Sequence, residues 1–102
     1  MQHIRYPSAE TVKKAIDPVQ FYASITGGSL GKPTSKGWHR WNGLCPFHDD
    51  TKAGSVSINH YTGAYKCFSC GAYHANIIDF FMAFEKCSFK EALYRLSKQE
   101  VK

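Results

Sequence analysis

Four side chains with metal-binding chemistry stand in two short pairs along this chain. Cys45 and His48 are separated by two residues, and so are Cys67 and Cys70, which follow after residues 49–66. A loop of two residues lets both side chains of a pair converge on one ion, with each sulfur about 2.3 Å from the metal. The spacing therefore predicts one structural Zn²⁺ ion bound by three cysteines and one histidine.

The fourth ligand position has a competitor in Cys87, the remaining cysteine of the chain. His48 is favoured because it is three residues from Cys45, as a knuckle requires, whereas Cys87 would leave Cys45 without a partner in its turn. Cys87 is then expected to be a small buried apolar residue. Three thiolates around a divalent ion give a site of net negative charge, and a complete protein ligand set leaves no position for a catalytic water.

Length and composition are those of one small domain. The chain has 102 residues and a mass of 11.5 kDa, which allows a modest core that a metal would help to stabilise. It begins with polar and charged residues rather than with a signal peptide, and no apolar run approaches the ~18 residues of a membrane span. We expect a cytoplasmic protein without membrane attachment, since reducing conditions favour metal binding over disulfides.

The elements around the four ligands predict an α+β fold, a zinc ribbon with a small antiparallel β-sheet flanked by N- and C-terminal helices. Ser8 is expected to cap a first short helix. Asp17 and Pro18 provide the N-cap and N1 residue of a second helix that ends at Gly27-Gly28. Residues 27–37 are rich in Gly, Ser, Lys and Pro and are interpreted as an exposed, mobile loop.

Three segments indicate the strands that carry the ligands. Residues 38–44 are expected to form a strand that leads to Cys45. Residues 55–60 alternate between polar and apolar side chains, and residues 64–68 return after a turn and carry Cys67. In this hairpin Val56 and Ile58 would face inward, while Ser55, Ser57 and Asn59 would form an open polar strip.

The C-terminal third is predicted to be helical. Phenylalanine and isoleucine residues recur at helical spacing after Asn76, a possible N-cap, and Ser88 with Glu91 forms a capping box for a last helix. Residues 99–102 are expected to be a frayed tail. The whole chain, 1–102, is interpreted as one domain with its core at about 12–98.

Several stretches together resemble a known family, the zinc-binding domain of bacterial replicative DNA primases, of the CHC2 zinc finger type. The resemblance covers about 12–97. The residues that carry it are Gly43-Leu44-Cys45-Pro46-Phe47-His48, Lys52 with Ser55-Val56-Ser57, Tyr65-Lys66-Cys67-Phe68-Ser69-Cys70-Gly71-Ala72, Ile78-Asp79-Phe80-Phe81 and Phe89-Lys90-Glu91-Ala92-Leu93-Tyr94-Arg95-Leu96.

The resemblance implies a module that recognises single-stranded template DNA during replication. It would act with a separate catalytic primase domain of the Toprim type in RNA primer synthesis, with a replicative helicase as a further partner. The chain would not be an enzyme alone and would have no catalytic residue. It departs from the family at Lys52-Ala53-Gly54-Ser55, where the family often has Lys-Thr-Pro-Ser, and at Tyr73-His74-Ala75-Asn76, so no template preference is carried over.

Charge and aromatic content agree with a nucleic-acid ligand. The formal net charge is +5, and single-strand binders combine cations with aromatic stacking surfaces. Six aromatic residues lie on or beside the predicted sheet, namely Trp38, Trp41, Tyr61, Tyr65, Phe68 and Tyr73. Because Trp38 and Trp41 fall on opposite faces of one strand, Trp41 is assigned to the core.

A specific DNA-binding set follows from these positions. We predict phosphate contacts for Lys36, Arg40, Lys52 and Lys66, base stacking for Trp38 and Tyr65, and close approach of the DNA at Ser55 and Ser57. The alternative interpretation is a solvated sheet face without a ligand.

Two other classes of function compete with template binding. One is a zinc-stabilised interaction module that docks to a primase, a helicase or another replication protein. The other is a metal-dependent enzyme, which the complete ligand set disfavours. Asp49 and Asp50 are adjacent in sequence and are interpreted as solvated or as supporting the first knuckle rather than as a catalytic pair.

Overall fold

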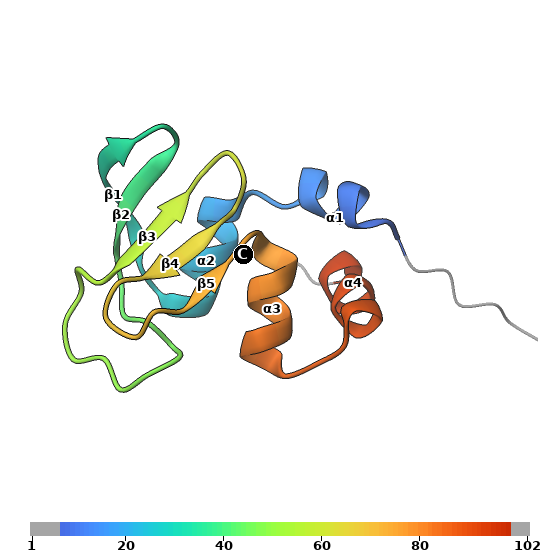
Figure 1. Cartoon of the computed structure of the whole chain (residues 1–102). Coiled ribbons are helices and arrows are strands. Elements are labelled where there is room, and N and C mark those ends of the chain that lie inside the picture. The colour runs from blue at the N-terminus through green and yellow to red at the C-terminus, as the bar shows by residue number, and fades with distance from the viewer. Residues whose placement is uncertain (1–6, 99–102) are drawn as a thin grey trace, which may run out of the picture.

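The computed structural model of the protein describes residues 7–98, which form an antiparallel sheet flanked by helices (Figure 1). The five strands lie in the order in which they occur in the chain. The strands are β1 (Ser29–Ser35), β2 (Trp38–Asn42), β3 (Val56–Asn59), β4 (Tyr65–Cys67) and β5 (Tyr73–His74), and the helices are α1 (Ala9–Ala15), α2 (Pro18–Thr26), α3 (Ile77–Glu85) and α4 (Phe89–Lys98). The predicted α+β class is confirmed.

Both N-terminal helices begin at the predicted caps, and α2 also ends at the predicted glycine. Ser8 Oγ accepts a hydrogen bond from the Thr11 N–H at 3.1 Å and caps α1. Asp17 Oδ2 accepts from the Gln20 N–H at 3.0 Å and caps α2. Gly27 adopts a left-handed conformation (φ 75°) that ends α2, a position that favours glycine because it has no Cβ.

The mobile loop expected at residues 27–37 is wrong in its central part, where the structure has β1. This strand lies at the edge of the sheet and pairs with β2, with irregular register between Leu30 and Ser35. An edge strand with bulges tolerates Pro33, which lacks an N–H, and the small residues that misled the sequence interpretation. The predicted exposure is confirmed for residues 32–36, whereas Gly28, Leu30, Gly31 and Gly37 are half-buried.

The strand register assigns alternate residues to two faces of the sheet. Residues that pair across neighbouring strands share a face. One row packs against α2 and α3 and is called the inner face here; it contains His39, Ile58, Tyr65 and His74. The opposite face is called the outer face here. Its central row contains Arg40, Ser57, Lys66 and Tyr73, and Trp38 and Phe68 lie on the same face, two residues from Arg40 and Lys66.

Aromatic side chains fill the core between the inner face and the helices. Tyr22 and Phe80 are fully buried, and their ring centroids lie 4.8 Å apart in an edge-to-face arrangement. The Tyr22 hydroxyl donates to the Gly63 carbonyl at 2.6 Å. Trp41 is 1% exposed and its Nε1–H donates to Thr26 Oγ1 at 2.9 Å, which confirms its predicted place in the core.

The C-terminal helices form a second group beside the sheet, where α1 lies against α3 and α4 (Figure 1). Asn76 Oδ1 accepts from the N–H groups of Ile78 and Asp79, and Ser88 Oγ accepts from the Glu91 N–H at 3.1 Å, so both predicted caps are confirmed. The expected frayed tail at 99–102 lies outside the described residues. Within residues 7–98, none of the helices combines the length and the apolar character needed to cross a membrane.

Candidate metal centre and nucleic-acid interface

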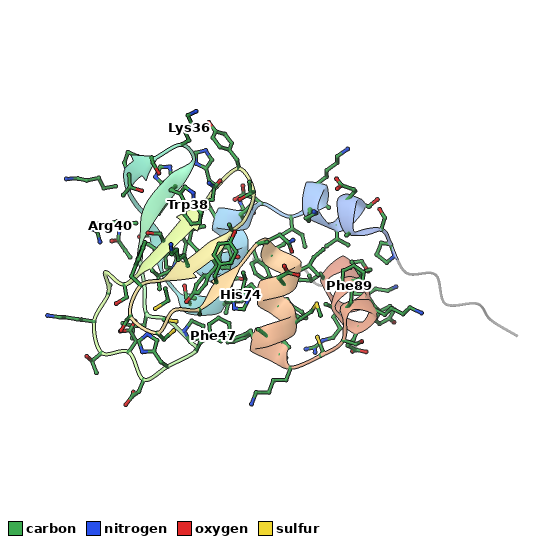
Figure 2. All side chains as sticks on the ribbon, in the orientation of Figure 1. Lys36, Trp38, Arg40, Phe47, His74 and Phe89 are labelled. Carbon is green, nitrogen blue, oxygen red and sulfur yellow. The ribbon has the colours of Figure 1, made fainter. Side chains whose placement is uncertain are left out.

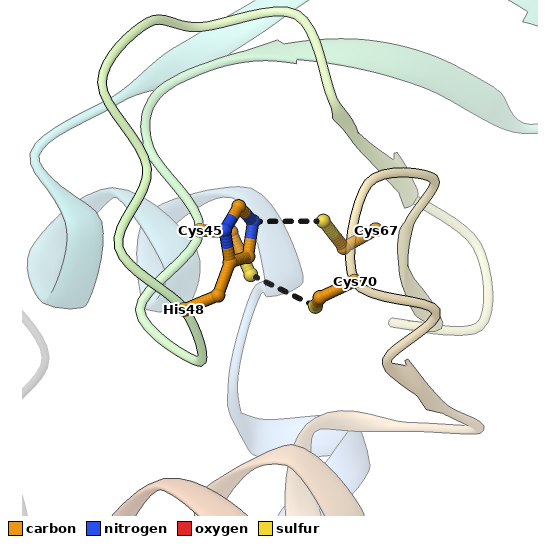
Figure 3. A group of neighbouring side chains, drawn as sticks. All are labelled: Cys45, His48, Cys67 and Cys70. Carbon is orange, nitrogen blue, oxygen red and sulfur yellow. Dashed lines mark hydrogen bonds between the residues drawn. The ribbon is translucent and has the colours of Figure 1, made fainter.

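The sheet brings the four predicted metal ligands to one point from two separate loops (Figure 3). Cys45 and His48 lie in the loop that follows β2. Cys67 is the last residue of β4, and Cys70 lies in the turn between β4 and β5. The ligand atoms of all four side chains lie within 4.8 Å of one another.

The spacing of these atoms fits a tetrahedral ion. The sulfurs of Cys45 and Cys70 are 3.9 Å apart, and Cys67 Sγ is 3.4 Å from His48 Nε2. Ligands about 2.0–2.3 Å from a central zinc ion stand about 3.5–3.8 Å apart at the corners of a tetrahedron. Three sulfurs and one imidazole also form a donor set that zinc prefers. Cys87 lies in the turn between α3 and α4 and is not one of the gathered side chains.

Local contacts hold the first knuckle in shape. Asp50 Oδ2 accepts a hydrogen bond from the Cys45 N–H at 2.8 Å, and its side chain is 8% exposed. Asp50 thus supports the knuckle, which is one of the two roles considered for it. The Phe47 ring lies between the sheet and α3, 5.0 Å from His74 and 5.3 Å from Phe80 between centroids (Figure 2). The ligand loop is therefore packed directly on the core.

The two buried sulfurs differ in their electrostatic surroundings before any metal binds. Burial would raise the pKa of the Cys67 thiol, but the backbone N–H groups of Cys70 and Ser69 outweigh it and lower that pKa to about 7. Burial raises the pKa of Cys45 to about 11, although a hydrogen bond from Tyr65 works in the opposite direction. Cys67 is therefore the more readily ionised of the two.

Tyr65 does not have the role that was predicted for it. Its side chain is fully buried on the inner face, where its hydroxyl donates to Cys45 Sγ at 2.8 Å. A ring without exposed surface cannot stack on a DNA base. Tyr65 is instead a neighbour of the metal ligands, and its hydroxyl bond to a ligand sulfur is of the kind that orients metal ligands in other sites.

Four other predicted DNA contacts do lie together on the outer face. Arg40, Ser57 and Lys66 pair in a row across β2, β3 and β4, and Trp38 lies beside them on β2. The guanidinium of Arg40 donates to the Gly54 carbonyl at 3.1 Å. Figure 2 shows Arg40 reaching outward from the sheet.

The remaining predicted contacts surround this face at its margins. Lys36 is exposed at the tip of the β1–β2 hairpin (Figure 2), and Lys52 is exposed in the loop before β3. Ser55 is half-buried directly before β3. Asn59, expected on an open polar strip, is 6% exposed, and its Oδ1 accepts from the N–H groups of Tyr61 and Thr62. It organises the β3–β4 turn.

Phe68 and Tyr73 were not singled out for base stacking, although the structure exposes both on the outer face. Phe68 is 66% exposed and Tyr73 is 57% exposed. The ammonium of Lys66 lies 4.9 Å from the centroid of the Phe68 ring, a cation–π contact. Strand alternation was the signal that could have found them, because a Cys67 that faces the metal requires Lys66 and Phe68 to face the other way.

Comparison with known proteins supports the metal centre. Residues 9–101 match the model of the CHC2 zinc finger family. The chain is 53% identical over 90 residues to a DNA primase of Helicobacter pylori strain 26695, covering 88% of the chain and 15% of that primase. It is 39% identical over 66 residues to the DNA primase of Escherichia coli K12, covering 65% of the chain and 10% of that primase.

A solved structure has the same fold. The crystal structure of the Aquifex aeolicus primase, with its zinc-binding and RNA polymerase domains, matches with a TM-score of 0.64 at 27% identity, covering 87% of the chain and 20% of that structure. The predicted zinc ribbon and its single structural zinc ion are confirmed by these similarities together with the cysteine and histidine cluster. The chain spans about a tenth to a fifth of the length of the proteins that it matches.

Proposed function

The chain belongs to the CHC2 zinc finger family and is a zinc-binding domain of the DNA primase type, and from this premise we propose that it binds single-stranded template DNA. The outer face of the sheet makes the contact. The bound template is then presented to a separate catalytic domain of the Toprim type, which synthesises the RNA primer. The domain itself contributes binding and placement rather than chemistry.

The observation that carries this proposal is the combination of cations and exposed aromatic rings on the outer face. Arg40 and Lys66 stand on either side of Ser57 in the strand register. The rings of Phe68 and Tyr73 are more than half exposed beside them. Cations that neutralise phosphates and rings that stack on bases are the two parts of a single-strand binding surface.

Zinc has a structural role in this proposal. Cys45, His48, Cys67 and Cys70 are assigned as its four ligands, with Nε2 as the ligand atom of His48. Bound there, the ion would stabilise the knuckles by holding three thiolates and an imidazole together. Because β4 carries both Cys67 and Lys66, the metal would also fix the strand that presents the outer face. A rigid surface loses less conformational entropy when it binds.

Binding by fluorescence anisotropy tests the proposal. Zinc-loaded protein is titrated with labelled single-stranded DNA at several salt concentrations, and Lys66→Ala and Lys52→Ala are compared with the wild type. Each lost phosphate contact should weaken binding and reduce the slope of log K against log salt by about 0.7. Lys14→Ala, an exposed change on α1 away from the outer face, is the matched control. Unchanged affinity and slope in both Lys66→Ala and Lys52→Ala would place the binding surface elsewhere.

A protein-docking role is the second candidate, and α4 supplies the observation that favours it. Phe89 and Tyr94 are 47% and 42% exposed on this helix (Figure 2 labels Phe89). The partner would be the catalytic primase domain or a replicative helicase, in the cytoplasm. Association that persists at high salt, from a protein without affinity for single-stranded DNA, would favour docking over template binding.

A further inference from the structure

The outer face is not flat, because two adjacent hollows open on it. One has a volume of about 280 Å³ and lies between Trp38, Lys66, Phe68 and Tyr73. The other lies toward Arg40 and Gly54. Ser57 and Phe68 line both of them. The first hollow is slightly smaller than the roughly 300–1,000 Å³ typical of sites for drug-sized ligands, so it suits one planar ring system.

Ser57 contributes a hydroxyl without a hydrogen-bond partner to these hollows. Its side chain lies on β3 between Arg40 of β2 and Lys66 of β4, and the residue is 7% exposed. Its hydroxyl makes no hydrogen bond within residues 7–98, and because no buried side-chain N or O atom there lacks a partner, the hydroxyl is open to the hollow rather than sealed in the core. The hydroxyl is therefore available to a ligand that enters the hollow.

The walls of the hollow are suited to an aromatic ligand. The Lys66 ammonium lies over the Phe68 ring, at 4.9 Å from its centroid, and because Phe68 is 66% exposed, its ring has surface available for a second ring. Tyr73 pairs with Lys66 in the register and is 57% exposed. Two exposed rings and a half-buried tryptophan thus line the hollow together with Ser57, and Thr34 and Ser35 of β1 complete its lining.

The charges beside the hollow indicate which kind of molecule supplies the aromatic ring that the hollow would bind. Arg40 and Lys66 stand on both sides of Ser57, and the acidic residues of the described chain lie outside the set that lines either hollow. A base attached to a phosphate backbone would place its ring in the hollow and its phosphates beside these cations.

We propose that one nucleobase of the template leaves the stack, enters the hollow against Phe68 and hydrogen-bonds through its edge to the Ser57 hydroxyl. This inference rests on the proposed binding of single-stranded DNA. A serine hydroxyl both donates and accepts, so it can pair with a donor or an acceptor on the base. Sequence preference would be strongest at this one nucleotide position, whereas the neighbouring nucleotides would be held through their phosphates.

An abasic scan measures whether one base has this special position. Zinc-loaded wild-type protein is titrated with a series of labelled oligonucleotides that carry a single abasic site, moved one position at a time. One position should lose about fivefold to a hundredfold in affinity, as expected when one stacked base is removed. The other positions should change little, because their phosphates remain.

Two variants connect that position to the hollow. Phe68→Ala should weaken binding and make the sensitive position insensitive to base removal. Ser57→Ala should retain the salt dependence but reduce discrimination among the four bases there by about fivefold to tenfold. Ser29→Ala, an exposed change at the far end of β1, is the control and should behave as the wild type. Circular dichroism and zinc content establish that each variant is folded.

The outcomes separate this inference from the proposed function. If wild-type protein that is folded and zinc-loaded binds none of the oligonucleotides, both the proposed template binding and the proposed base site are wrong. If it binds all of them with uniform affinity, template binding stands and the base site is overturned. A sensitive position that persists in Phe68→Ala would also overturn the assignment to this hollow. Phe68→Ala alone decides the question if Ser57→Ala does not fold.

Discussion

The hydroxyl of Tyr65 is buried among aromatic rings and donates to a metal-ligand sulfur. Its ring is fully buried, and the oxygen lies 2.8 Å from Cys45 Sγ. A hydrogen bond from a neutral donor stabilises the thiolate relative to the thiol, which agrees with its lowering effect on the pKa of Cys45. Tyr65 should therefore strengthen zinc binding without being a ligand.

Tyr65→Phe tests this at the scale of one oxygen atom. The change removes the donor and keeps the ring, so the fold should persist while zinc affinity falls by about tenfold or more, as for other groups that orient metal ligands. Competition with a chromogenic chelator measures the affinity. Tyr61→Phe, in an exposed side chain of the β3–β4 turn, is the control. Equal zinc affinities for wild type and Tyr65→Phe would show that the hydroxyl has no effect on the metal.

Residue spacing predicted the metal cluster but not the role of Tyr65. The two short pairs of ligands have few alternative uses, so they could be identified without any knowledge of the fold. Tyr65 was assigned to base stacking as one of six aromatic residues on or beside the predicted sheet, without regard to the face on which it lies. Tyr65 lies two residues before Cys67, and residues two apart in a strand share a face. The sequence therefore indicated that Tyr65 faces the metal side of the sheet.

At the scale of elements, the end of α2 and the β1–β2 hairpin fit together through Gly28. A Cβ built on Gly28 would lie 2.5 Å from the Asn42 carbonyl oxygen and 2.6 Å from Trp41 Nε1. Backbone and a buried ring supply these contacts, so neither can move aside at low cost. The glycine allows α2 to connect to the sheet edge at close range.

Gly28→Ala should therefore destabilise the protein by about 1–3 kcal/mol, the usual range for overpacking in a well-packed interior. Urea denaturation in saturating zinc measures the free energy of unfolding. The neighbouring exposed position supplies the comparison, since Ser29→Ala should remain within about 0.5 kcal/mol of wild type. A Gly28→Ala protein as stable as the wild type would mean that the hairpin shifts freely relative to α2.

The helices could be predicted from the sequence more completely than the strands. Ser8, Asp17, Asn76 and Ser88 each cap a helix through a hydrogen bond between neighbours in the chain, so the signal is local. The strand β1 has no such signal, because pairing with β2 holds it in place despite Pro33. The two residues of β5 are too few to form a pattern and depend on β4 for their conformation.

At the scale of the whole molecule, the metal cluster and the aromatic core are continuous. Phe47, within the first knuckle, contacts the ring of Phe80 in α3, and Tyr65 contacts both Cys45 and Phe80. The metal site is therefore attached to the packing that joins the sheet to the helices. Loss of the ion should affect the domain as a whole rather than the knuckles alone.

Zinc removal tests this continuity. Chelation removes the ion that joins two buried cysteines and an imidazole. A decrease of about 3 kcal/mol in the free energy of unfolding would lower the melting temperature by about 12–24 °C. Thermal unfolding followed by circular dichroism, with and without a chelator, measures the change. Adding zinc back should restore the melting temperature. An unchanged melting temperature after verified zinc loss would show that the core is independent of the metal.

The strand β4 has a consequence for how this sequence can change over generations. Tyr65 and Cys67 point to the inner face, and Lys66 and Phe68 point to the outer face. Deleting or inserting one residue here would exchange the two faces and remove the metal ligand and the proposed base-stacking ring in a single event. The loop between Asp50 and Gly54 contains no metal ligand and pairs with no strand, so length variation among descendants should accumulate there and spare these four positions.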